Sequence, residues 1–243
     1  MEPRKTPSWI IPRGRFTFTS KLKMEEFGMD YIMEVMPSLI SGMGVTLSVF
    51  FWTLVGSLPL GLIVALGMMS RFKILQKILG IYVWLMRGTP LLLQLIFVFY
   101  GLPLLGTGIV LPRYEAALVA FILNYTAYFA EIFRGGLQSI DKGQYESAKV
   151  LRLSYWQTIR KVVAPQVIKI VIPSIGNEVI NLVKDSSLVY VIGLGDLLRA
   201  GNVATSRDVT LVPLLLVGAM YLMMTAFFTY VLKKIEQHYS YWK

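Results

Sequence analysis

The sequence predicts an all-α, polytopic membrane protein with five transmembrane helices and one long polar loop between the third and the fourth. Of the 243 residues, 55% are hydrophobic and 16% are charged, and the mean hydropathy is +0.60. This is not the balance of a soluble globular protein. The apolar residues gather in runs that reach the roughly 20 residues a helix needs to cross a bilayer.

Residue types that are absent or rare limit the kinds of site that this chain can form. The chain has no cysteine and one histidine, His238, which excludes disulfides and thiolate metal sites and argues against a histidine metal cluster. We therefore expect no metal site. The net charge of +10 is explained by the basic loops of a protein surrounded by membrane lipid, and we expect no nucleic-acid partner.

Residues 1–36 precede the first apolar run and form the first of three parts. Their basic residues are not followed by the apolar core of a signal peptide, and residues 24–36 mix acids with apolar residues in the manner of an interfacial helix. Residues 37–234 form the membrane domain. Residues 235–243 form a C-terminal tail.

The five spans follow the apolar runs. They are residues 39–69, 78–102, 114–133, 168–192 and 211–232. The first exceeds the length that a bilayer needs, so it must tilt, kink at Pro59 or project. The fifth is predicted to stop at Lys233 and Lys234.

The second span contains the motif Arg87-Gly88-Thr89-Pro90. Arg87 follows Lys77 by about 15 Å of helix axis, which puts a charge near mid-membrane. Pro90 cannot donate a hydrogen bond to the Met86 carbonyl, so the helix should kink there. One interpretation is a functional charge, and the other is a cation that snorkels to the interface beside a tolerated proline.

The third span carries Asn124, Tyr128 and Glu131 at helical spacing, so that these residues share one face. Glu131 and Arg134 are three residues apart and can form an ion pair. Because charged groups avoid lipid, this face should point into the helix bundle.

The fourth span carries a polar stripe at helical period. Its members are Ser174, Asn177, Glu178, Asn181, Lys184 and Asp185. The stripe either lines a polar passage or buried network, or makes structural contacts between helices. Residues 193–198 are then predicted to be a connection, and residues 199–210 continue as a polar segment.

Residues 134–167 form the long polar loop. Asp141 followed by Gln144, and Ser154 followed by Gln157, are two capping-box patterns. They predict short helices over residues 144–151 and 155–163, the second ended by Pro165. On these features alone, the loop could equally be a solvated connection.

Counting Lys and Arg places this loop in the cytoplasm. The internal loops on that side then hold most of the basic residues, and the other side holds only Arg113, Arg199 and Arg207 if the N-terminal tail is ignored. With five spans, the N-terminus lies outside and the C-terminus in the cytoplasm. The basic residues of the tail oppose this assignment.

Several motifs together, in this order, resemble the permease subunit of an ATP-binding-cassette importer for polar amino acids. The loop carries Glu146-Ser147-Ala148, with Arg152 where the family has a glycine, and Ala164-Pro165 where it has Leu-Pro. The other matching segments are Arg87-Gly88-Thr89-Pro90-Leu91 with Gln94, residues 130–136, Asn177-Glu178 and residues 184–188. The resemblance covers residues 36–234 and implies the fold of a type I importer.

The resemblance implies a protein of the bacterial cell membrane that is not an enzyme and works by alternating access. The expected partners are ATPase subunits, a second permease that is identical or a paralogue, an extracellular solute-binding protein and a polar amino acid. ATP and Mg²⁺ would bind the ATPase, in keeping with the lack of a phosphate-binding loop here. The loop would be a coupling helix that contacts the ATPase through Gly143, Gln144, Tyr145, Glu146, Ser147, Ala148, Leu151 and Arg152.

The resemblance also suggests a substrate pathway. Its candidate residues are Arg87, Thr89, Gln94, Asn124, Thr126, Asn177, Glu178, Asn181, Lys184 and Asp185. Glu178 and Asn181 would meet the substrate's ammonium group, and Arg87 or backbone amides at Pro90 its carboxylate. Alternatively, Glu178 pairs with Lys184 or Arg87.

Two questions stay open at the level of sequence. A glycine at position 152 would adopt a positive φ angle; with arginine there, either the turn moves to Leu153-Ser154 or Arg152 is a surface contact. A self-contained secondary transporter or channel for a small polar solute would also explain the spans and the stripe. It would not explain two capped helices in a basic loop.

Overall fold

The computed structural model describes residues 29–239, so most of the predicted N-terminal tail and the last residues of the C-terminal tail lie outside the described part. The chain divides into two compact units, Met1–Pro37 and Ser38–Lys243. Within residues 29–239 the secondary structure is helical throughout and contains no strand. The predicted all-α class is confirmed.

The helices follow one another with short connections. They are α1 (Met29–Met68), α2 (Lys73–Gly88), α3 (Leu91–Ile96), a π-helix η1 (Phe97–Gly101), α4 (Leu102–Leu104), α5 (Arg113–Gln138), α6 (Lys142–Val150), α7 (Tyr155–Thr158), a π-helix η2 (Ile159–Val163), α8 (Ala164–Asp185), a 3₁₀-helix η3 (Ser186–Ile192), α9 (Leu197–Asp208) and α10 (Val212–Tyr239). In the described part of the chain, four stretches are long and apolar enough to cross a membrane, and a bent helix pair can make a fifth span.

The first span belongs to one helix of 40 residues, α1. The described part of the predicted interfacial segment continues into this helix, and the helix passes through Pro59 without a break. Small residues bring α1 against α5: a Cβ atom on Gly56 would lie 2.8 Å from Ile122, and one on Gly61 would lie 2.6 Å from Phe129. The two glycines therefore allow a contact that larger residues would prevent.

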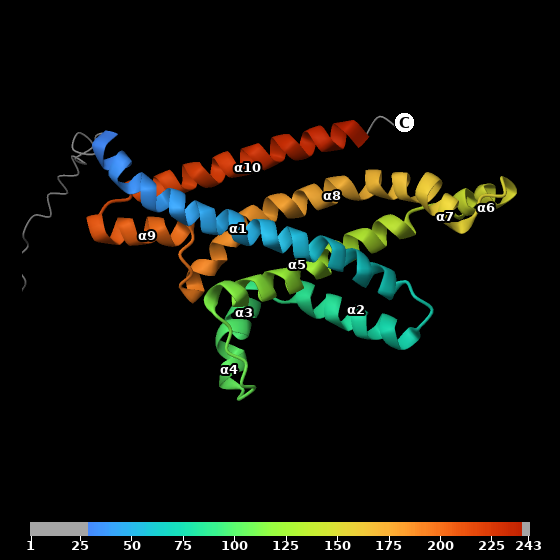
Figure 1. Cartoon of the computed structure of the whole chain (residues 1–243), viewed down its shortest axis with the longest axis horizontal. Helices are drawn as coiled ribbons and strands as arrows, with labels where there is room; N and C mark the ends of the chain where they lie inside the picture. The colour runs from blue at the N-terminus through green and yellow to red at the C-terminus, as the bar shows by residue number, and fades with distance from the viewer. Residues whose placement is uncertain (1–28, 240–243) are drawn as a thin grey trace, which may run out of the picture. The chain divides into compact units, whose positions relative to one another are not determined.

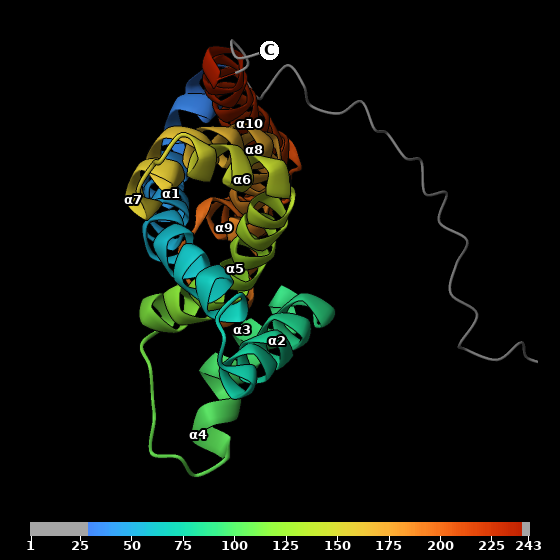
Figure 2. The same ribbon diagram turned by 90° about the vertical axis from the view of Figure 1, so that its right-hand side faces the viewer.

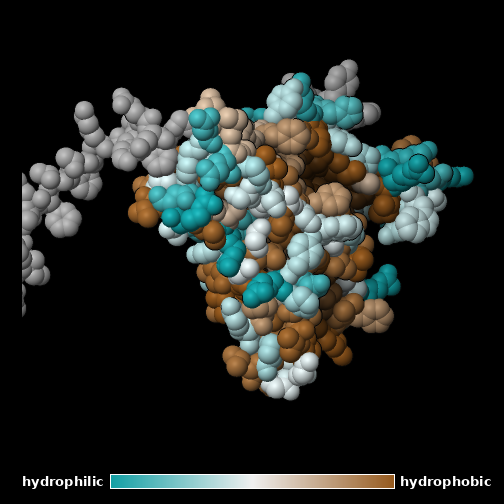
Figure 3. Space-filling model, turned by 60° about the vertical axis from the view of Figure 1, so that its left-hand side comes forward, coloured by the Kyte–Doolittle hydropathy of each residue, from teal (hydrophilic) through white to brown (hydrophobic). Residues whose placement is uncertain are grey.

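The second span is broken, not merely kinked. α2 and the segment Leu91–Leu104 meet at an angle of 106°, and residues 89 and 90 are not helical. Figures 1 and 2 show α3 and α4 leaving the bundle as a projection. Figure 3 shows that hydrophobic residues make up much of it, and Leu93 and Leu104 are among its exposed apolar side chains.

The polar loop is shorter than predicted, because α5 and α8 each extend into it. Figures 1 and 2 place α6 and α7 together at one end of the Ser38–Lys243 unit. Pro165 was expected to end the second short helix, and this prediction is wrong. The five π-helical residues of η2 precede α8, and the Ala164 amide donates to Ile159, five residues back. Pro165 follows η2 within one continuous helical stretch, and the π-helical turn accommodates its missing amide hydrogen without ending the helix.

The polar segment 199–210 forms most of a helix that the sequence reading missed, α9. Asp196 caps it, accepting hydrogen bonds from the amides of Leu198 and Arg199, both at 3.1 Å. α10 continues beyond Lys233 and Lys234 to Tyr239. The two lysines therefore do not end the helix.

Candidate functional site

The break between α2 and α3 is held by side chains that replace the hydrogen bond Pro90 cannot make. The Met86 carbonyl accepts from the Gln94 amide at 2.9 Å and from the Asn124 amide at 3.2 Å. Asn124 also donates to the Gln94 side-chain oxygen at 3.0 Å, and Gln94 lies 2.7 Å from the Thr89 hydroxyl. This network ties the broken span to α5.

A cavity of about 420 Å³ opens beside the break. It is bounded by residues from the break and the start of α3, from α5, from the second half of α8 and from η3. They are Thr89, Pro90, Leu91, Leu92, Asn124, Tyr125, Tyr128, Glu178, Asn181, Asp185 and Leu188. The lining combines amide, hydroxyl and carboxylate groups with apolar surface, as small-molecule sites commonly do.

The polar stripe of α8 divides between two sides of the helix. Glu178, Asn181 and Asp185 line the cavity, and the Asp185 carboxylate accepts a hydrogen bond of 2.8 Å from Tyr125. Lys184 instead lines a separate cavity with Tyr221 of α10, since adjacent helical residues point about 100° apart. Ser174 and Asn177 are exposed on α8 and line neither cavity.

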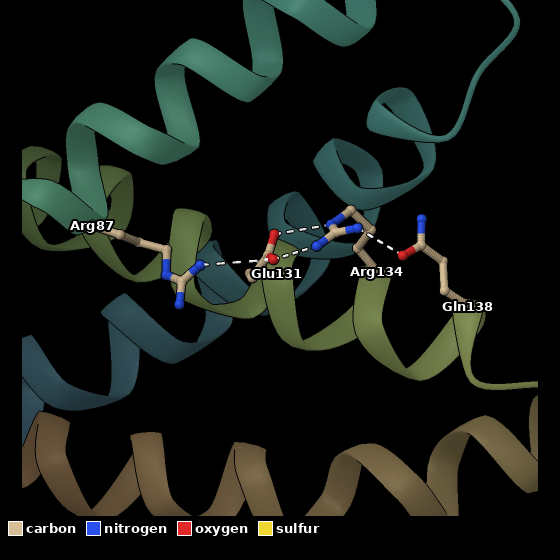
Figure 4. Close-up of polar contacts among 4 residues, drawn as sticks. All are labelled: Arg87, Glu131, Arg134 and Gln138. Atoms are coloured by element: carbon tan, nitrogen blue, oxygen red, sulfur yellow. Dashed lines mark hydrogen bonds and ion pairs between the residues drawn. The ribbon is translucent and has the colours of Figure 1, made fainter.

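Arg87 lies near the cavity but is engaged by α5. Its guanidinium approaches the Glu131 carboxylate to 3.8 Å and stands 5.5 Å from the centre of the Tyr128 ring. Figure 4 shows the chain of contacts from Arg87 through Glu131 and Arg134 to Gln138. The predicted Glu131–Arg134 pair is present, and Arg87 forms its ion pair with Glu131, not with Glu178.

Gln94 and Thr126, two other candidates for the substrate pathway, do not line the cavity. Gln94 supports Thr89 through the network at the break and does not line the cavity. Thr126 is buried and does not line it either. On α5, Asn124 and Tyr128 are four residues apart and share the cavity side, whereas Thr126 lies half a turn away.

The coupling-loop candidates face in different directions. Gln144, Glu146, Ser147, Leu151 and Arg152 are exposed, and Gly143 is partly buried. Ala148 is buried, with 1% exposed, and Tyr145 packs on a core formed by Ile140 and by residues of η2 and α8. These last two residues therefore anchor α6 to the membrane helices and do not offer a free surface.

The two predicted caps have different outcomes. The Ser154–Gln157 capping box is present in both directions. Asp141 caps α6 by accepting from the Gly143 amide at 2.8 Å. Its predicted box is incomplete, because the Gln144 side chain accepts from Gln166 instead, at 3.3 Å.

Arg152 occupies the left-handed conformation that a glycine would take, with φ of 55°. The Leu153 amide donates to the Ala148 carbonyl at 3.0 Å, and the Arg152 amide to Lys149 at 2.9 Å. These two bonds define a Schellman motif at the end of α6. The turn has not moved to Leu153-Ser154; arginine carries the conformational strain.

Several residues of the two sites were missed at the level of sequence. Tyr125 and Leu188 line the cavity without belonging to a polar pattern in the sequence, whereas Tyr128 shares the polar face of the third span. On the loop, Val150, Tyr155 and Trp156 are 83%, 71% and 76% exposed. Large apolar side chains in a basic, non-spanning loop are a signal that could have been used.

Most of the chain is similar to known membrane transport proteins. Residues 57–241 match the family of binding-protein-dependent transport system inner membrane components. The arginine transport system permease protein ArtQ of Bacillus subtilis (strain 168) is 37% identical over 202 residues, 83% of this chain and 92% of that protein. The glutamine transport system permease protein GlnP of Escherichia coli (strain K12) is 32% identical over 87% of this chain and 97% of its own.

Solved structures give the same result. A crystal structure of an amino acid ABC transporter with histidines superposes with a TM-score of 0.79 at 35% identity, covering 86% of this chain and 97% of that one. The MetNI methionine ABC transporter, at 19% identity and a TM-score of 0.67, supports the fold alone.

Proposed function

The chain belongs to the family of binding-protein-dependent transport system inner membrane components, and from that premise we propose that it carries a polar amino acid with a cationic side chain through the cavity beside Pro90. The protein is a multi-pass permease subunit of an ABC amino acid importer. The proposal concerns its substrate, its route and the way its transport is driven.

One observation carries the choice of substrate. Glu178 and Asp185 place two carboxylates in one cavity of a membrane helix bundle, while the nearby Arg87 is engaged by Glu131. Ionisable side chains that face the interior of a membrane helix bundle mark substrate pathways. Two carboxylates complement a substrate with an α-ammonium group and a second cationic group. That ArtQ is an arginine permease protein and the related transporter is one with histidines supports this choice.

The opposite side of the cavity suits the substrate's carboxylate. Thr89, Leu91 and Leu92 line it at the start of α3, where backbone amides are not all used within the helix. The substrate would lie with its carboxylate towards the break and its cationic groups towards α8. Asn181 and Tyr128 would offer further hydrogen bonds.

We place the coupling to ATP at the end of the unit formed by α6 and α7. Exposed Leu151, Tyr155 and Trp156 give this end an apolar surface, with Glu146 and Arg152 beside it. An ATPase subunit that binds there with ATP and Mg²⁺ would move α7 and α8 between inward- and outward-open states. A second permease and a solute-binding protein complete the proposed importer, in the cytoplasmic membrane with the N-terminus outside and the C-terminus inside.

Reconstitution tests this proposal. The permease and its ATPase are purified together, placed in liposomes with ATP on the ATPase side, and assayed with solute-binding protein and labelled arginine, histidine, glutamine or glutamate. We expect ATP-dependent uptake of arginine or histidine above that of the other two. Equal uptake of glutamate would overturn the cationic preference. Uptake by the permease alone, without ATPase subunits, would instead support a self-contained transporter.

A further inference from the structure

Another cavity, of about 740 Å³, lies under the coupling loop, between α6 and the start of α8. Lys161, Gln166 and Lys169 contribute to it from η2 and α8, and Gln144 contributes from α6. Both lysines are exposed. Among the described residues that line this cavity, none is acidic. The polar side of the cavity therefore presents two cationic groups and two amide groups.

The two glutamines connect the two sides of this cavity. Gln166 donates to the Gln144 side-chain oxygen at 3.3 Å and lies 2.8 Å from the Val162 carbonyl. α6 is also held by the apolar contact of Tyr145 with the core of Val163 and Val167. The cavity is therefore a fixed feature of the packing between α6 and α8, and its polar side has a defined position.

The remaining lining is apolar and continues onto the membrane-spanning surface. Pro165 and Ile170 line the cavity. The Ile170 side chain is 45% exposed on α8, and the nearby Ile168 side chain is 39% exposed. The polar loop ends here and the apolar span begins. A basic side thus meets an apolar side at the membrane boundary.

We propose that this cavity binds an anionic phospholipid, with the phosphate group between Lys161 and Lys169 and an acyl chain along Ile170. Basic pockets at the ends of membrane helices bind lipid headgroups of this class. A free anion would use the lysines but not the apolar side, whereas an acidic protein segment would have no reason to contact the exposed isoleucines of a membrane helix. The inference holds whichever solute the permease carries.

The test measures lipid retention by the full-length permease. Protein in nanodiscs of phosphatidylcholine with a minor fraction of phosphatidylglycerol is released into mild detergent, and bound lipids are counted by native mass spectrometry. The variant Lys161→Gln with Lys169→Gln removes two charges from the cavity. The matched control, Lys142→Gln with Lys149→Gln, removes two exposed charges from α6 that do not line it.

We expect the parent protein and the control to retain phosphatidylglycerol in preference to phosphatidylcholine. The cavity variant should lose about fivefold of that preference for each lysine, or about 25-fold in all. An equal loss in both double variants would show a diffuse charge effect and overturn the inference. Unchanged lipid retention in the cavity variant would also overturn the inference. If that variant then failed to co-purify with the ATPase, a protein segment would be the occupant of the cavity. Near-UV circular dichroism confirms that each variant is folded.

Discussion

The side-chain amide of Asn124, on α5, donates a hydrogen bond to the backbone carbonyl of Met86, on α2, at 3.2 Å. That carbonyl is the one that Pro90 leaves without its usual helical donor. A residue of another helix thus completes the hydrogen bonding of a broken span. The same residue lines the cavity, so the support of the break and the surface of the site share one side chain.

Asn124→Leu should destabilise the protein. It removes the donor of the Gln94 side-chain oxygen and one of the two donors of the Met86 carbonyl, which keeps Gln94. An unsatisfied buried group costs about 1–3 kcal/mol. Thermal unfolding in detergent, followed by near-UV circular dichroism, should show a lower midpoint. Asn177→Leu is the control, because Asn177 is exposed on α8. Equal midpoints for the parent and the Asn124 variant would contradict the role assigned to this bond.

Glu178→Gln should weaken binding of a cationic amino acid more than that of a neutral one. A hydrogen bond to a charged group contributes about 1.5–3 kcal/mol, so we expect about a tenfold or greater loss for arginine. Substrate-stimulated ATPase activity of the complete importer measures it, with glutamine as the neutral probe. Asn177→Ala, outside the cavity, should change neither. A similar loss for both substrates would make Glu178 structural.

Arg152→Gly should stabilise the loop. A non-glycine residue at the Arg152 φ of 55° costs about 1 kcal/mol relative to glycine. Arg152→Ala is the control, because alanine loses the charge and keeps the strain. We expect a higher midpoint of thermal unfolding for the glycine variant only. If both variants behaved alike, the guanidinium would be responsible and not the backbone.

Asp196 should make stability depend on pH. Burial raises the pKa of its carboxyl from 3.8 to about 6, so between these values the folded state binds a proton that the unfolded state has lost. Stability should therefore increase as pH falls from about 7 towards 5. Asn at this position keeps a capping oxygen and cannot titrate. Between about pH 7 and 5, the midpoint of thermal unfolding should rise less for Asp196→Asn than for the parent protein. If the midpoints of both proteins changed equally with pH, Asp196 would not be the titrating group.

Trp156→Asp should weaken ATPase binding. The Trp156 side chain is 76% exposed, and a charge there would oppose an apolar contact with the partner. Co-purification of the ATPase with the tagged permease measures the effect, and we expect a loss of about tenfold or more if Trp156 is an interface anchor. Lys142→Asp, a charge change at an exposed position of α6, serves as the comparison. Undiminished co-purification would remove α7 from the proposed interface.

Much of the site could be predicted from spacing. Helical period placed Glu178, Asn181 and Asp185 on one stripe, and these three line the cavity. Helical period alone does not show that Asp185 lines this cavity while Lys184 lines another. Where one face of a helix ends depends on which helices pack beside it. The prediction for Thr126 was wrong for the same reason: its hydroxyl is buried on the side of α5 that faces away from the cavity, and a polar residue in a span does not by itself show which side it faces.

The prolines show the limit of local rules. Pro90 was expected to bend a helix, and the break of 106° depends on Gln94 and Asn124 to satisfy the exposed carbonyl. Pro165 was expected to end a helix and does not, because the π-helix η2 accommodates it. In both cases the decisive atoms are hydrogen-bond partners that sequence spacing does not specify. Arg152 is similar, since its strain is maintained by the packing of α6.

The continuity from α7 to η3 makes one helical stretch of 38 residues, Tyr155–Ile192. Its first turn belongs to the loop, and Glu178 follows Tyr155 by about 35 Å of helix axis. Such a stretch acts as a lever: a tilt imposed at one end displaces Glu178 and Asp185 together, without a relay of side-chain rearrangements. Its stiffness is lowest at η2 and at Pro173, where the regular hydrogen-bond ladder is interrupted. Those two points set how much of an imposed motion reaches the carboxylates and how much is lost as bending.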